Sequence, residues 1–205
     1  SINEDLPRFV VLGGPTPADT RPSFESYYLG SRYTGVPLSL DPKNPLPYGT
    51  RATDVLAAEQ YNEFELIGQL NELSRVEYPD DPNLLARIRA YELAYRMQGC
   101  APEAVDTSAE SDATKKLYGL DNQITEPFGR QCLMARRLVE RGVRFVQLFH
   151  GGLGVQNTDT WDAHSNLKEN HTQHATETDL PIAGLLTDLK ALGMLDSTLI
   201  VWHAE

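Results

Sequence analysis

This sequence is poor in positive charge, in cysteine and in long apolar runs. It has 18 Lys and Arg against 29 Asp and Glu, which gives a formal net charge of −11 and a pI near 4.9. Nucleic acids are bound by clustered basic side chains, so this balance argues against a nucleic-acid partner. No apolar run approaches the ~20 residues that a membrane-spanning helix needs, so no transmembrane segment is predicted.

The two cysteines, Cys100 and Cys132, are too far apart in the sequence to form a metal-binding motif. Packed thiols on or beside helices are expected, and a disulfide between them is the alternative. No amino-terminal signal sequence is recognisable. The chain begins at Ser1 without a methionine, so we expect any leader to have been removed or to lie outside this sequence.

What is present predicts a single, partial α/β domain over residues 1–205. Hydrophobic residues make up 40% of the chain, which suffices for a buried core. Phe9 to Leu12 reads as a buried strand. Residues 13–49 hold seven of the 13 prolines, so an irregular excursion is predicted there. Its aromatic side chains either wall a pocket for a ring-shaped substrate or pin the loop to the body.

Helical patterns dominate the middle of the chain. Residues 54–98 predict an antiparallel helical pair broken at Tyr78 to Asp81, with Gly99 as its end. A short helix is predicted from Asp112 to Leu117, and another from Glu126 to Arg141. The arginines of the last helix are spread around it, which favours a solvated face over an anion site.

Residues 125–205 predict a helix, a strand, a loop, a helix and a second strand, and they contain all five histidines. The first strand is Val143 to Phe149, the long helix covers about 166–192 with Pro181 as a kink or restart, and the second strand is Thr198 to His203. Strands joined through a helix are parallel, so their carboxyl ends share one edge of the sheet, where ligands bind.

Four side chains are therefore expected to converge at that edge: His150, Asp162, His164 and Glu205. Imidazoles with carboxylates ligate zinc or manganese, and carboxylates also suit calcium or magnesium. Asp162 and His164 face one ion if their segment is extended. The alternative is a loop residue beside a hydrogen-bonded surface histidine. His171 and His174 share one helix face, where ligation competes with a solvated pair.

Several separate runs carry a resemblance that covers most of the chain from about Leu6 onward. They are LARIRAYELAYRMQ, APEAVD, LYGLD, FGRQCLMARRLVERGVRFVQLFHGG, WDAHSNLKENH and DLPIAGLLTDLKALGMLDSTLIVWHAE. In these runs the chain resembles the bacterial family of domain of unknown function 1501, which is abundant in planctomycetes. That family looks like a member of the alkaline-phosphatase and sulfatase clan.

The resemblance implies a parallel sheet with divalent metal at the strand ends and hydrolysis of sulfate or phosphate esters, from small-molecule or polysaccharide anionic substrates. It carries Asp162, His164 and Glu205 over as metal ligands, with His150 as a candidate catalytic residue. It also implies a periplasmic or secreted setting.

A Gly-Gly-Pro-Ser and Asp-Thr-Phe-Asp type segment is expected before residue 1, and a Glu-Phe-Gly-Arg motif begins at Glu205. An internal, inactive fragment is therefore expected, with the nucleophile outside it. The alternative function is a non-catalytic binding or surface-assembly module.

Overall fold

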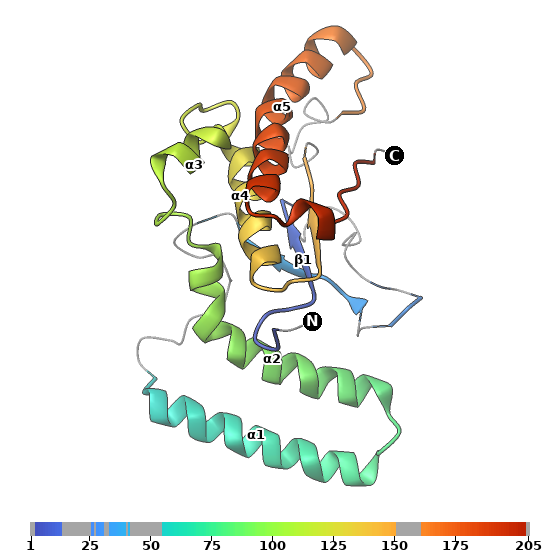
Figure 1. The fold of residues 1–205 in the computed structure, drawn as a ribbon. Coiled ribbons are helices and arrows are strands. Elements are labelled where there is room, and N and C mark those ends of the chain that lie inside the picture. Colours follow the sequence, from blue (N-terminus) through green and yellow to red (C-terminus); the bar gives the residue numbers. More distant parts are fainter. Residues whose placement is uncertain are drawn as a thin grey trace.

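The structure is a computed structural model, and it describes residues 3–13, 26, 28–30, 33–39, 41, 55–150 and 161–203. Its centre is a three-stranded parallel sheet in the order β2-β1-β3 (Figure 1). The strands are β1 (Phe9–Leu12), β2 (Val36–Leu38) and β3 (Phe145–Leu148). The fold is therefore α/β, and the predicted parallel sheet is confirmed.

The central strand β1 is the most deeply buried part of the sheet. Val10, Val11 and Leu12 are at most 1% exposed. Such an unbroken apolar run is typical of a parallel strand that is covered on both faces. The edge strand β2 lies inside the predicted irregular excursion, and Pro37 is tolerated in it because an edge strand can lack one backbone donor.

The helices follow the predicted order. They are α1 (Ala57–Glu77), α2 (Pro82–Val105), α3 (Asp112–Leu117), α4 (Glu126–Glu140) and α5 (Leu167–Ala191), with a 3-10 turn η2 (Leu195–Ser197). The hairpin of α1 and α2 lies at one end of the molecule, and α5 runs beside α4 at the other (Figure 1). Gly99 does not end α2, and Pro181 does not interrupt α5. Within the described ranges, no helix has the length and hydropathy that crossing a membrane requires.

The helix α4 connects the sheet to the rest of the molecule. Leu133 and Leu138 are fully buried, and Cys132 is a free, fully buried thiol. Two arginines of this helix correct the expectation of a solvated face. Arg136 forms ion pairs with Glu110 at 2.9 Å and with Asp188 at 3.0 Å, and Arg137 pairs with Glu110, so both guanidinium groups are buried among carboxylates.

The predicted second strand from Thr198 to His203 is wrong in the structure. These residues form no strand, and Leu199 is 88% and Trp202 67% exposed. β-branched and aromatic residues favour a strand, but a strand also needs a hydrogen-bonded neighbour. Within the described ranges no strand pairs with this segment, and the edge strand β3 is paired with β1 only.

Aromatic residues of the proline-rich excursion were expected to line a pocket or to pin the loop. Of those that the structure describes, Tyr28 is 98% and Tyr33 56% exposed, so neither belongs to the buried core. Phe24, Tyr27 and Tyr48 lie outside the described residues.

Candidate functional site

The candidate site begins at the carboxyl end of β3. The backbone N–H of Phe149 donates to the carbonyl of Leu12 at 3.0 Å, which keeps the ends of β3 and β1 side by side. His150 follows directly, at the edge of the sheet where ligands of parallel α/β proteins bind. Its side chain is 16% exposed.

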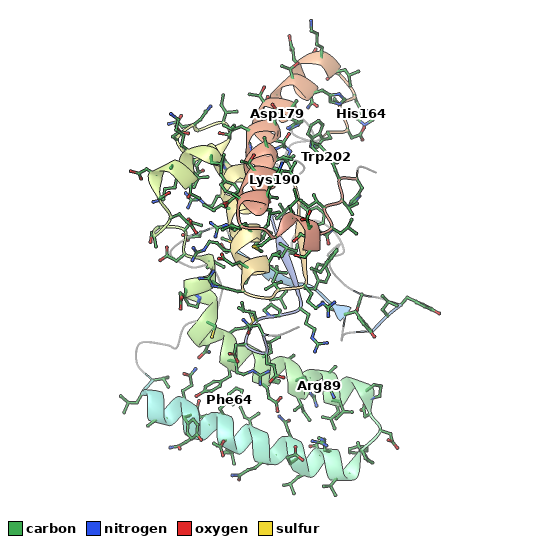
Figure 2. All side chains as sticks on the ribbon, viewed as in Figure 1. Phe64, Arg89, His164, Asp179, Lys190 and Trp202 are labelled. Carbon is green, nitrogen blue, oxygen red and sulfur yellow. The ribbon has the colours of Figure 1, made fainter. Side chains whose placement is uncertain are left out.

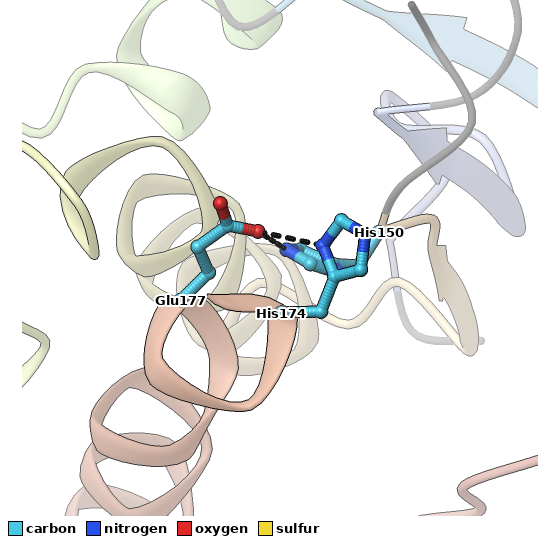
Figure 3. Close-up of side chains that lie close together, drawn as sticks. All are labelled: His150, His174 and Glu177. Carbon is cyan, nitrogen blue, oxygen red and sulfur yellow. Dashed lines mark hydrogen bonds and ion pairs between the residues drawn. The ribbon is translucent and has the colours of Figure 1, made fainter. Parts of the chain in front are cut away.

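The second part of the site lies on α5. His174 and Glu177 are three residues apart, so they share one face of the helix, and His174 is only 4% exposed. Glu177 Oε2 lies 2.9 Å from His174 Nδ1 and 3.0 Å from His150 Nε2 (Figure 3). One carboxylate oxygen thus contacts two imidazoles that come from different elements. These three residues are called the His–His–Glu cluster below.

Aromatic side chains surround the cluster. The indole N–H of Trp161 donates to His150 Nδ1 at 3.1 Å, and the Trp161 ring lies 5.0 Å from the His174 ring. Phe128 of α4 meets the His150 ring edge-on at 4.9 Å. His171 Nε2 hydrogen-bonds to the carbonyl oxygen of Trp161 at 3.0 Å. The imidazole rings of His150 and His174 are therefore enclosed by other side chains rather than exposed to solvent.

This enclosure sets the charges of the cluster. Burial lowers the pKa of His150; the carboxylate of Glu177 opposes this shift and His174 adds to it. Burial alone raises the pKa of Glu177, but hydrogen bonds from Gln173 and His174 outweigh it, together with the charges that His150 and His174 carry when protonated in acid, so its pKa is lowered. At neutral pH, a neutral His150 therefore faces an ionised Glu177.

The predicted ligands Asp162 and His164 contact each other but lie outside this cluster. Asp162 Oδ2 is 3.0 Å from His164 Nε2, and their side chains are 81% and 79% exposed. Figure 2 shows His164 on the segment that leads into α5. Glu205 lies outside the described residues, so its place as a third ligand stays a prediction. Within the described ranges, the only group of three or more potential metal ligands is the His–His–Glu cluster.

The comparisons with known proteins identify a family. A family model described as "Protein of unknown function (DUF1501)" matches residues 1–205. The chain is a DUF1501 protein. No curated protein and no solved structure matches it.

The donor set of this DUF1501 chain fits a borderline divalent ion better than a hard one. Two imidazoles and one carboxylate suit zinc, whereas calcium and magnesium prefer oxygen ligands throughout. Ligands about 2.1 Å from a tetrahedral ion lie about 3.4 Å apart, and the three ligand atoms here lie within 4.8 Å of one another. The distances of 2.9 and 3.0 Å are also those of direct hydrogen bonds, so the cluster is stable without an ion.

The glycine-rich segment expected before residue 1 has a counterpart inside the DUF1501 chain. Directly after β1 the sequence reads Gly13-Gly14-Pro15-Thr16, and Asp19-Thr20 follows. These residue types are similar to those of the expected segment, whose position before residue 1 stays a prediction. Gly13, with a φ of +69°, lies at the same sheet edge as His150, and residues 14–25 lie outside the described part.

Sequence reasoning did not single out Glu177, and it did not predict that His150 and His174 would lie together. The available signal was the spacing of His174 and Glu177 on one face of a helix predicted to cross back over the sheet. That spacing is common on solvated helices, so it gained weight only when the structure placed His150 opposite.

Proposed function

We propose that this DUF1501 protein is a metal-dependent hydrolase of sulfate or phosphate esters, with His150, His174 and Glu177 as ligands of a divalent ion. The observation that carries the proposal is the convergence of two imidazoles and one carboxylate at the carboxyl edge of a parallel sheet. The expected kinship of the family with the alkaline-phosphatase and sulfatase clan, which rests on the sequence resemblance alone, supports the reaction class by analogy.

Three protein ligands are the number found in catalytic zinc sites, because they leave a coordination position for water or substrate. When bound, such an ion polarises an ester oxygen and lowers the pKa of a bound water. The residues of the chain provide the positioning. Before an ion binds, Glu177 holds both imidazoles through one oxygen, and Phe128 and Trp161 keep bulk water from His150.

Asp162 and His164 retain a proposed role as a second, more exposed pair of ligands. They lie immediately after Trp161, which touches the His–His–Glu cluster, and Glu205 is proposed with them on the strength of the resemblance alone. A chain with a net charge of −11 repels an anionic ester at long range. A cation at the site would offset that repulsion locally.

Metal content and turnover test the proposal together. The purified intact protein is expected to hold stoichiometric zinc or manganese and to hydrolyse an aryl sulfate or an aryl phosphate. Glu177→Gln should lose both. Glu169→Gln is the matched control, because Glu169 is an exposed acid in the first turn of the same helix. A protein that is metal-free and inert would refute the proposal. Metal lost in Asp162→Ala but kept in Glu177→Gln would move the ligand set to the exposed pair.

The second candidate is a non-catalytic binding or surface-assembly module. One observation favours it: every imidazole nitrogen of His150 has a protein partner at hydrogen-bond distance without any ion. Under this alternative the cluster only ties α5 to β3. Glu177→Gln would then reduce stability while metal content and turnover stayed absent in all variants.

A further inference from the structure

The hydrogen bond between Trp161 and His150 fixes where the His150 proton sits. An indole N–H can only donate, so His150 Nδ1, at 3.1 Å, must offer a lone pair. The single proton of the neutral imidazole is then on Nε2. From there it donates to Glu177 Oε2 at 3.0 Å.

This tautomer is the wrong one for holding a metal through Nε2. A ligating nitrogen must present its lone pair, and the other ring nitrogen then carries the proton. In metal sites that second N–H normally donates to a carboxylate, a carbonyl or a water. Here it would face the N–H of Trp161, so two donors would meet at 3.1 Å.

We propose that Trp161 is a positioning residue that holds His150 in its non-ligating tautomer, and that binding of a divalent ion displaces the Trp161 indole from His150. The inference rests on the proposed metal site. The imidazole keeps one proton throughout, which moves from Nε2 to Nδ1 by exchange with solvent. Metal occupancy and the Trp161 hydrogen bond are mutually exclusive.

The corresponding contact of His174 imposes no such conflict. Its Nε2 lies 3.5 Å from Nδ2 of Asn170. A side-chain amide carries both an acceptor and donors, so a rotation lets Asn170 accept a proton from His174 Nε2 when Nδ1 binds the ion. An indole has no acceptor to offer. Of these two contacts, only the one made by Trp161 therefore has to break.

The movement of Trp161 would extend to its neighbours. Its ring lies 5.0 Å from the His174 ring and 5.8 Å from the His171 ring, and its carbonyl oxygen contacts His171 Nε2 at 3.0 Å. Displacement of the indole therefore changes the packing at the start of α5. This makes Trp161 fluorescence a direct measure of occupancy.

The chain has two tryptophans, so one substitution isolates the signal. In a Trp202→Phe background, titration with Zn²⁺ is expected to change the emission of Trp161. Trp202 is 67% exposed, which makes its replacement mild. Trp161→Phe keeps an aromatic ring but removes the donor. It should bind zinc about fivefold more tightly, as measured by chelator competition, because one net hydrogen bond no longer has to break.

Nitrogen NMR of the metal-free protein reads the tautomer independently. His150 should carry its proton on Nε2 in the wild type, and Trp161→Phe should weaken this preference, which then rests on the Glu177 carboxylate alone. Stoichiometric zinc binding with unchanged Trp161 emission and unchanged affinity in Trp161→Phe would overturn this inference and leave the metal site standing. A proton on Nδ1 in the metal-free protein would overturn it as well. Absence of zinc binding, with Glu177→Gln identical to wild type, would overturn the metal site itself and this inference with it.

Discussion

Replacing Gly184 by alanine tests how closely α5 approaches α3. A Cβ at Gly184 would lie 2.4 Å from the carbonyl oxygen of Leu117 and 3.2 Å from Cα of Tyr118. Both are backbone atoms, so the helices must separate by about 1 Å to reach an ordinary contact of about 3.5 Å. Overpacking of this kind costs about 1–3 kcal/mol. The better helix propensity of alanine offsets about 1 kcal/mol of that cost.

Gly99 provides the matched control. It also lies inside a helix, α2, but nothing lies within 4 Å of the position that its Cβ would take. Gly99→Ala should therefore raise the free energy of unfolding by about 1 kcal/mol. In a protein of this size that is a rise in melting temperature of about 2–4 °C, against a fall of up to about 8 °C for Gly184→Ala, whose net cost is at most about 2 kcal/mol. Circular dichroism during urea and thermal unfolding measures both. The close approach of α5 to α3 is refuted if Gly184→Ala unfolds at or above the wild-type temperature.

Three further predictions concern charge, thiol reactivity and the hairpin. Burial alone raises the pKa of Glu110, but hydrogen bonds and charges from Arg137 and Arg136 lower it overall. Its contribution to stability is therefore present above the unfolded pKa of about 4.3 and is lost as the pH falls through the lower folded value. Glu110→Gln should have a lower free energy of unfolding than wild type at pH 7, and this difference should shrink in acid. Urea unfolding at several pH values measures it, and a difference that stayed constant with pH would contradict the prediction. Burial raises the pKa of the Cys132 thiol to about 12. A thiol reagent should therefore modify the half-buried Cys100 in the native protein and Cys132 only after unfolding. Equally fast reaction of the two thiols would show that Cys132 is accessible. Phe64 stacks on Tyr95 between α1 and α2, with 4.2 Å between the ring centroids (Figure 2). Phe64→Ala should therefore speed proteolysis within the hairpin while α4 and α5 remain protected. A uniform loss of protection would contradict a hairpin that opens separately.

The parts of the fold that were predictable are those with a local cause. Phe9–Leu12 is a short apolar run, and it forms β1 with the predicted bounds. Asp81 accepts a hydrogen bond from the N–H of Leu84, and Ser111 accepts one from Thr114, so the starts of α2 and α3 follow from capping residues. The continuation of α2 past Gly99 was missed because an open glycine costs a helix only about 1 kcal/mol.

The parts that could not be predicted depend on partners distant in the sequence. Arg136 is buried because Glu110 and Asp188 meet it from two other segments. The segment 198–203 has the composition of a strand, but no neighbouring strand receives it. Likewise, His150 was predicted as a site residue from its place after β3, whereas Glu177 became a candidate only when α5 was placed against that strand end.

Polar contacts hold the long helix α5 against the rest of the molecule at two positions along its axis. Near its middle, Glu177 binds His150 of the strand end; near its end, Asp188 accepts a hydrogen bond from Tyr118 and pairs with Arg136. Hydrophobic contact is non-directional and tolerates sliding along a helix axis, but polar contacts near 3 Å do not. The two anchors therefore set the axial position of α5, so that a shift by one turn would break both at once and carry His174 away from its partner on the sheet.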